Sequence, residues 1–476
     1  MSNIKGPDLD WLENASFRDR VATVGEDGKR NWLYPLKPKG KWFNKRSIVA
    51  IIYYVLFFSL PFIYVKGRPL FLFNFPESKF ILFGYAFWPQ DFFVFGLIMM
   101  AGILFIALFT NAFGRIFCGW ICPQTIFMEM LFRRVDFIVL GTAQKQKYLA
   151  NAKWSGEKAK KYTLRYVIYF VLSFIIANTF LSYIIGVGEL KKIVTEPLSM
   201  HIGGFAAIIA FTAVFFSVFA FLREQVCTNI CPYGRLQGVL LDKNSIVVAY
   251  DYKRGETRAK FKKGNHDDVG DCIDCHQCVD VCPTGIDIRN GTQLECVNCT
   301  ACIDACNLIM DKVGRPQGLI RYDSENNIAE GIKFKFTSKL KAYSAVLSVL
   351  LIAIVSLLIT RKDVDGTLMR TSGMLFQERG TDSISNLYNI KLTNKTMHHY
   401  NIDLLPDNFT GRIELVGKPH IEMKPEEQIS ATFFLIMPRK NIEERKQKIK
   451  VGLYNGEKKI NTKASTFLGP ISRRDD

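Results

Sequence analysis

The sequence predicts a multidomain membrane protein, with a bundle of five transmembrane α-helices, a cysteine-rich insert of the α+β class, and an all-β C-terminal domain. Three observations support this fold class. Apolar stretches of membrane-spanning length recur, all twelve cysteines lie between Cys118 and Cys306, and short alternating apolar patterns fill the chain after Arg361. With 476 residues, 49% hydrophobic and 13% aromatic, the chain has room for several folding units and is more apolar than most soluble proteins.

The apolar stretches have the length that a bilayer requires, which is about 20 residues for a helix. None has a polar face, so the alternative of buried helices in a soluble core is disfavoured. We expect spans at 47–65, 92–113, 164–187, 202–222 and 342–360.

The basic residues of the connecting segments predict the orientation of these spans. Residues 1–46 and 114–165 hold ten Lys or Arg each, whereas residues 66–91 hold three and residues 188–201 hold two. The first two segments are therefore expected in the cytoplasm and the other two outside. Residues 1–46 also lack the features of a signal peptide.

This topology predicts the organisation of the whole chain. Residues 47–222 carry four spans with a cytoplasmic loop at 114–163, the insert 223–341 is cytoplasmic, and 361–476 form an external domain. A net charge of +18 is then largely explained by contact with the bilayer, without nucleic acid. The expected location is the inner membrane of a bacterium.

Two cysteine runs mark the insert, with a core at about 262–322. From Cys272 and from Cys296 the chain reads C-x2-C-x2-C-x3-C, the run of bacterial two-cluster ferredoxins, in which the fourth cysteine of each run binds the other cluster. One 4Fe-4S cluster would be held by Cys272, Cys275, Cys278 and Cys306, and the other by Cys296, Cys299, Cys302 and Cys282.

Paired C-x-x-C groups also suit tetrahedral zinc, which is the alternative. Four cysteines in each duplicated run, with Pro283 after the first run, favour clusters. Asn307 stands where the second run usually has a proline, which removes no ligand. His276, inside the first run, is interpreted as a solvent-facing side chain.

Two further cysteine pairs occur where the second and fourth spans reach the cytoplasm. Both follow an arginine, Arg115 or Arg223, and both end in Ile-Cys-Pro, so they form an internal repeat: Cys118, Cys122, Cys227 and Cys231. On a helix, positions four apart share a face. If the two helices pack together, four thiols converge, and thiolates favour Cu(I), zinc or iron–sulfur iron. The alternative is buried, inert cysteine at helix ends.

The source of electrons is not visible in the sequence. No Gly-x-Gly-x-x-Gly turn follows a strand, and His201 is the only histidine close to a membrane helix, so neither a nicotinamide site nor a bis-histidine haem is expected. We expect an unknown cytoplasmic electron donor.

The C-terminal domain alternates apolar and polar residues, as in Tyr388, Ile390 and Leu392, with turns such as Asn455-Gly456. A small antiparallel sandwich fits this pattern. Surface residues are the favoured interpretation of its Met397, His398, His399 and His420, with a copper site as the alternative.

The chain resembles the cytochrome c oxidase accessory proteins CcoG, also known as FixG or RdxA. The resemblance rests on Gly114 to Thr125, on Cys227 to Pro232, on both ferredoxin runs, and on Met310 to Tyr322. It covers essentially the whole chain, and it implies that the external domain is immunoglobulin-like.

The resemblance implies a cupric reductase that converts Cu(II) to Cu(I) in support of assembling a cbb3-type oxidase. Its expected partners are oxidase subunits or copper-handling proteins, with copper as substrate at the four membrane-edge cysteines. Two other functions stay open: a membrane electron conduit to another acceptor, and a non-enzymatic assembly scaffold. The sequence leaves the oligomeric state open.

Overall fold

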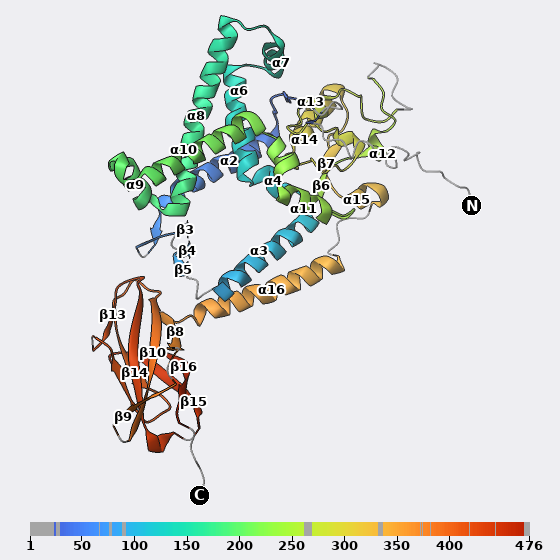
Figure 1. The fold of residues 1–476 in the computed structure, drawn as a ribbon. Coiled ribbons are helices and arrows are strands. Elements are labelled where there is room, and N and C mark those ends of the chain that lie inside the picture. Colours follow the sequence, from blue (N-terminus) through green and yellow to red (C-terminus); the bar gives the residue numbers. More distant parts are fainter. Residues whose placement is uncertain are drawn as a thin grey trace, which may run out of the picture. The chain divides into compact units, whose positions relative to one another are not determined.

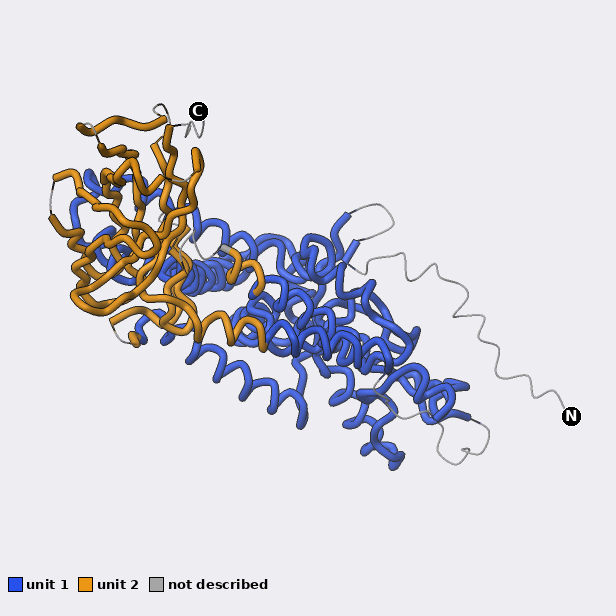
Figure 2. Tube along the Cα trace, turned by 90° about the horizontal axis from the view of Figure 1, so that it is seen from below, with its two compact units in different colours: residues 1–63, 98–351 blue, residues 64–97, 352–476 orange. Residues whose placement is uncertain are grey.

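The computed structural model describes residues 23–24, 29–65, 67–75, 79–87, 92–260, 269–331, 337–371, 373, 375–380, 382–417, 419–442 and 444–470. Much of the predicted N-terminal segment therefore lies outside the described residues, as does the start of the predicted insert core. The chain divides into two compact units, 1–63 with 98–351 and 64–97 with 352–476 (Figure 2).

Within the part of the chain that the structure describes, five helices are long and apolar enough to cross a membrane, which confirms the predicted number. These spans are Lys41–Phe62, Phe93–Phe113, Gly156–Ile185, Ile202–Leu222 and Ser338–Ile359. The third begins eight residues before its predicted start at Leu164, because Ser155 caps the helix there by accepting a hydrogen bond from the Lys158 amide at 3.3 Å. The apolar stretch of the sequence does not reveal the polar residues with which this helix begins. The orientation of the spans remains a prediction.

The spans contain the longer helices of Figure 1, and shorter segments lie at their ends. The longer helices are α2 (Lys41–Ser59), α3 (Phe92–Phe113), α8 (Gly156–Ile185), α10 (Ile202–Ser217) and α16 (Ser338–Ile359). The shorter ones are α4 (Ile116–Trp120), α5 (Pro123–Phe127), α6 (Arg133–Val139), α7 (Ala143–Asn151), α9 (Val187–Thr195) and α11 (Pro232–Leu240). Three π-helical turns occupy Met128–Phe132, Val218–Leu222 and Val226–Ile230, and 3-10 turns occupy Leu60–Phe62 and Leu198–Met200.

An aromatic core joins α5, α8 and the end of α10. Phe127, Phe132, Tyr169 and Phe219 are almost fully buried, and the rings of Phe132 and Phe219 stack with centroids 4.3 Å apart. Burying such rings is among the largest apolar contributions a core can receive. This core fixes α5, which follows the first membrane-edge cysteine pair, and the turn Val218–Leu222, which precedes the second.

The insert is α+β, as predicted. Strand β6 (Val247–Tyr250) pairs antiparallel with β7 (Ile320–Asp323). Around them lie α12 (Tyr252–Gly255), α13 (Gln277–Asp280), the 3-10 turn Ile288–Asn290, α14 (Ala301–Val313) and α15 (Glu325–Glu330). Helix α14 packs against the start of α2, where the Asp304 carboxylate accepts hydrogen bonds from the amides of Trp42 at 3.1 Å and Phe43 at 2.7 Å.

The second unit contains the predicted β-sandwich. One sheet has the order β12-β14-β10-β8, with β9 beside β10, and the other has the order β13-β11-β15-β16. The strands are β8 (Val364–Arg370), β9 (Gln377–Arg379), β10 (Ser383–Asn394), β11 (Tyr400–Pro406), β12 (Arg412–Leu415), β13 (Ile421–Met423), β14 (Gln428–Pro438), β15 (Lys446–Asn455) and β16 (Lys458–Leu468). A 3-10 turn, Arg439–Asn441, follows β14. The predicted alternation is confirmed, since Tyr388, Ile390 and Leu392 are fully buried.

The same unit also includes the segment between the first two spans. It forms a short hairpin, β1 (Tyr64–Val65) with β2 (Arg68–Pro69), and an antiparallel meander, β3 (Phe71–Asn74), β4 (Lys79–Leu82) and β5 (Tyr85–Phe87). Glu426 of the sandwich forms ion pairs with Arg68 and Lys79 of this segment.

Candidate functional site

Four cysteines surround one cavity in the insert, which we name the outer site: Cys272, Cys275, Cys278 and Cys306. Tyr250, Met310 and Ile320 complete the wall of this cavity. Cys275 is exposed, so this site reaches solvent. The structure thus brings together the first predicted ligand set.

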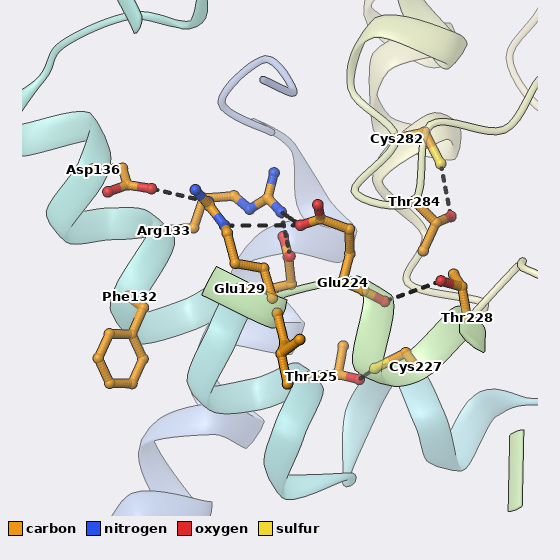
Figure 3. A network of polar contacts seen from close by, with 12 residues as sticks. Thr125, Glu129, Phe132, Arg133, Asp136, Glu224, Cys227, Thr228, Cys282 and Thr284 are labelled. Atoms are coloured by element: carbon orange, nitrogen blue, oxygen red, sulfur yellow. Dashed lines mark hydrogen bonds and ion pairs between the residues drawn. The ribbon is translucent and has the colours of Figure 1, made fainter. Parts of the chain in front are cut away.

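The second predicted set lines another cavity, which we name the inner site: Cys282, Cys296, Cys299 and Cys302. Cys278 of the outer site also lines this cavity, so the two sites are direct neighbours. Thr284 lies beside Cys282, with Oγ1 3.4 Å from Sγ (Figure 3).

The backbone of the two runs is duplicated, like their sequence. The residues before and after the second cysteine of each run are left-handed: Asp274 and His276 in the first, Asn298 and Thr300 in the second, with φ between 52° and 66°. This conformation is unfavourable for residues other than glycine and is found where the surrounding structure imposes it. It lets three closely spaced thiols face one cavity.

Burial dominates the acidity of these thiols. It raises the pKa of Cys278, Cys296 and Cys306 to about 12 and that of Cys299 to about 11. Thiolates at such positions need cations at close range, which the iron of a cluster supplies. Among the described residues, no three His, Cys, Asp or Glu side chains are grouped to hold a single metal ion. Thiols placed around a cavity fit a cube of iron and sulfide better than one zinc ion.

The membrane-edge cysteines form a third group, the thiol quartet: Cys118, Cys122, Cys227 and Cys231. In each pair the first cysteine lies in a short helical turn, α4 or the turn Val226–Ile230, and the second is the N-cap of the next helix, α5 or α11. Each pair therefore spans a helix break and does not share one continuous helix face. The reason is the following proline, which takes the first position of a new helix.

The two pairs converge. Cys122, Cys118 and Cys231 lie close enough to Cys227 to add to the effect of its burial, which raises the pKa of that thiol to about 12. The Cys118 thiol donates a hydrogen bond to Gln237 Oε1 at 2.8 Å. Cys227 Sγ lies 3.7 Å from Thr125 Oγ1 (Figure 3). Gln237 lies on α11 and Thr125 on α5, so each pair is contacted by the helix that follows the other pair.

The quartet lies against the inner site. Cys118 packs in one apolar cluster with Val297 and Cys299. Gly119 leaves no room for a side chain, because a Cβ there would lie 2.3 Å from the Val297 carbonyl oxygen. The Trp120 indole N–H donates to the Asn298 carbonyl at 3.3 Å. The turn α4 is therefore in direct contact with the loop that carries Cys296 and Cys299.

A buried charge network supports the second pair of the quartet. Asp136 forms ion pairs with Arg165 at 2.7 Å and Arg223 at 2.9 Å. Next to them, the Glu224 carboxylate contacts Arg133 (Figure 3) and Arg30. The Glu224 backbone carbonyl accepts the amides of Cys227 and Thr228. Sequence reasoning missed this network, although Arg223 was noted as the arginine upstream of the pair.

The histidines of the C-terminal domain do not assemble into such a site. His399 and His420 line one open cleft, and His420 Nδ1 lies 2.5 Å from the Asp403 carboxylate. His398 and Met397 do not line it, and the described part of this domain has no group of three metal-ligating side chains. His276, interpreted as solvent-facing, has an exposed side chain that contacts Arg289 at 3.1 Å.

Three family models match the chain. A 4Fe-4S dicluster domain matches residues 222–325, a 4Fe-4S binding domain matches residues 92–141, and the immunoglobulin-like fold at the C-terminus of FixG matches residues 354–470. Iron–sulfur domains in a chain with five membrane-spanning helices indicate an electron-transfer protein of the membrane.

Curated relatives extend over most of the chain. Protein RdxB of Cereibacter sphaeroides is 33% identical over 386 residues, which are 77% of this chain and 80% of the relative. Protein RdxA of the same organism is 35% identical over 70% of this chain and 72% of its own length. Nitrogen fixation protein FixG of Rhizobium meliloti is 33% identical over 63% of this chain and 59% of its own. Extended similarity of this kind, together with the matching domains, shows that the chain belongs to the family of RdxA, RdxB and FixG.

Proposed function

We propose that this protein takes single electrons at the outer site, passes them through the inner site, and reduces Cu(II) to Cu(I) at the thiol quartet. The observation that supports this route is the contact of the quartet with the inner site, where Cys118 and Cys299 share one apolar cluster. Copper itself comes from the resemblance to CcoG proteins.

In this proposal the eight cysteines of the insert hold two 4Fe-4S clusters, four at each site. When bound, each cluster supplies a one-electron carrier. The two sites are adjacent, because Cys278 lines both cavities. The exposed Cys275 marks the outer site as the place where an electron donor would approach.

The quartet suits the product of the reaction. One electron converts Cu(II) to Cu(I), and thiolates are soft ligands that bind Cu(I) more strongly than hard cations. Gln237 of α11 contacts Cys118, and Thr125 of α5 contacts Cys227. A copper ion bound by both cysteines would therefore draw the two cysteine pairs together. No protein group is consumed, because the electron comes from an external reductant on the donor side.

The test uses purified full-length protein with clusters reconstituted under anaerobic conditions. With a chemical reductant, it should reduce Cu(II), measured with a Cu(I)-specific chelator. Replacing the four quartet cysteines with serine should abolish this reduction while the iron content stays the same. Undiminished reduction in that variant would contradict the proposed copper site.

Iron quantification separates a second possibility for the quartet. The 4Fe-4S binding model matches residues 92–141, which include Cys118 and Cys122, so an iron–sulfur cluster at the quartet is the alternative. Two clusters require about eight iron atoms per chain and three require about twelve. An iron content of about twelve atoms per chain, falling to about eight in the serine variant, would mean that the quartet holds a third cluster and not copper.

The remaining functions make different predictions. A conduit to another acceptor would show cluster signals without preference for copper. A scaffold would depend on the external domain, so deleting 362–476 would abolish assembly of a cbb3-type oxidase and leave Cu(II) reduction intact. A reductase would lose assembly in the quartet variant as well, and added Cu(I) should restore it.

A further inference from the structure

Two arginines beside the inner site are buried without a carboxylate partner among the described residues. Arg46 and Arg115 are each 3% exposed. The Arg46 Nε donates to the Gly119 carbonyl at 2.7 Å, and Arg115 donates to the Leu294 carbonyl. Arg46 Nη2 and Arg115 Nε are buried with no hydrogen-bond partner. A buried guanidinium with only neutral partners is costly, so such groups normally face an anion.

Both guanidinium groups act on thiols of the inner site. Burial raises the pKa of Cys296 and Cys299, and the charge of Arg115 opposes this at Cys296 while that of Arg46 opposes it at Cys299. Arg115 also favours the thiolate of Cys118 in the quartet. The two cations therefore face the inner site, and Arg115 lies between that site and the quartet.

Two carboxylates near the inner site, those of Glu129 and Asp304, are already engaged. Glu129 forms an ion pair with Arg133 at 3.0 Å. Asp304 accepts the amides of Trp42 and Phe43 at the start of α2, where the helix dipole favours a negative charge. Neither carboxylate neutralises Arg46 or Arg115.

The outer site has the opposite arrangement. Its buried arginine, Arg289, forms ion pairs with Asp274 at 2.5 Å and Asp287 at 2.6 Å. Arg254, which lowers the pKa of Cys306 against the larger effect of burial, is paired with Asp271. The positive charges of the outer site are therefore neutralised within the protein.

We propose that Arg46 and Arg115 are the counter-charges of a cluster at the inner site and make it the more easily reduced of the two. A cluster held by four thiolates is an anion, and reduction adds one negative charge, which nearby cations stabilise. The exclusion of water from the inner site disfavours the added negative charge and lowers the midpoint potential of its cluster. The two cations without a carboxylate partner offset this decrease. Electrons that enter at the outer site then collect beside the quartet. This inference rests on the proposed clusters, but it does not depend on copper.

The test is an EPR-monitored redox titration of the full-length protein without copper. Wild type should show two one-electron steps. R115Q and R46Q should each lower the higher midpoint potential and leave the lower one in place. We expect the ratio of reduced to oxidised cluster at a fixed potential to change about tenfold, which corresponds to about 59 mV for one electron.

Charge-conserving variants keep the test valid if a glutamine variant folds poorly. R115K and R46K should keep the higher midpoint potential near its wild-type value. If the arginines had a purely structural role, the lysine and the glutamine variants would both change it. K161Q, which removes a cation that forms an ion pair with Glu157 at 2.6 Å on α8, is the matched control and should change neither midpoint.

Two results would overturn the inference: midpoints that do not respond to R115Q and R46Q, or a response of the lower step. A wild-type iron content far below about eight atoms per chain would instead refute the cluster assignment itself.

Discussion

The two arms of the thiol quartet share a sequence motif and a backbone but differ in their charge environment. In both arms a cysteine-proline step ends one helical turn and begins the next helix. The arginine before the first pair, Arg115, has no carboxylate partner among the described residues, whereas Arg223, before the second pair, forms an ion pair with Asp136. The repeat therefore duplicates the positions of the thiols but not their electrostatics.

This difference suggests a division of labour. The first arm contacts the inner site through Gly119 and Trp120, so its unpaired cation can act on the redox groups. The second arm is fixed by a network of buried ion pairs, so its contribution is a rigid position. Substitutions in each arm can separate these roles.

The largest effect is expected from D136N in the second arm. The substitution leaves the buried Arg165 and Arg223 without their carboxylate, and breaking a buried ion pair typically costs roughly 3–5 kcal/mol. We expect a large loss of thermal stability in detergent, followed by circular dichroism. E189Q, which removes an exposed partner of Lys192, should have almost no effect. Equal stabilities of the two variants would mean that the network is not a structural support.

A smaller effect is expected from G119A in the first arm. The added methyl group would meet the Val297 carbonyl, and overpacking of this kind costs roughly 1–3 kcal/mol. Because α4 must move away from the inner site, the rate of Cu(II) reduction should fall while iron content is retained. G102A, where a Cβ meets nothing within 4 Å, serves as the control. An unchanged rate in G119A would argue against electron transfer through this contact.

Replacing Gln237 tests the polar partner of the first arm. Its amide is fully buried, accepts from Cys118 and donates to Thr110 at 3.1 Å, so Q237L should cost roughly 1–2 kcal/mol. Thermal unfolding measures this loss, and competition with a Cu(I) chelator should show weaker binding. Unchanged stability and unchanged Cu(I) binding in Q237L would argue against a supporting role of this amide.

The smallest effect is expected from T125V in the second arm. The contact of Thr125 with Cys227 is long, 3.7 Å, and its loss should cost less than about 1 kcal/mol, or less than about fivefold in Cu(I) affinity. The same chelator competition measures it. A loss larger than that of Q237L would reverse the proposed roles of the two arms.

Local patterns in the sequence predicted the number of spans, the strands of the sandwich and the two cysteine sets that surround the cavities. Most of these depend on residues close together in the chain, such as Cys296, Cys299 and Cys302, and the exchange of the fourth cysteine between the runs follows the ferredoxin pattern. The position of Arg46 could not be predicted, since it was only the last cation of a polar segment until α2 packed against the insert. The exchange of partners between the arms, Gln237 with Cys118 and Thr125 with Cys227, likewise depends on tertiary packing.

Helix α14 carries one cysteine of each cavity, Cys302 of the inner site and Cys306 of the outer site. Four residues along an α-helix advance about 6 Å, and a helix backbone changes this spacing little. The spacing between the two sites is therefore set by a rigid helix. Changes in the sequence of the surrounding loops would not lengthen it.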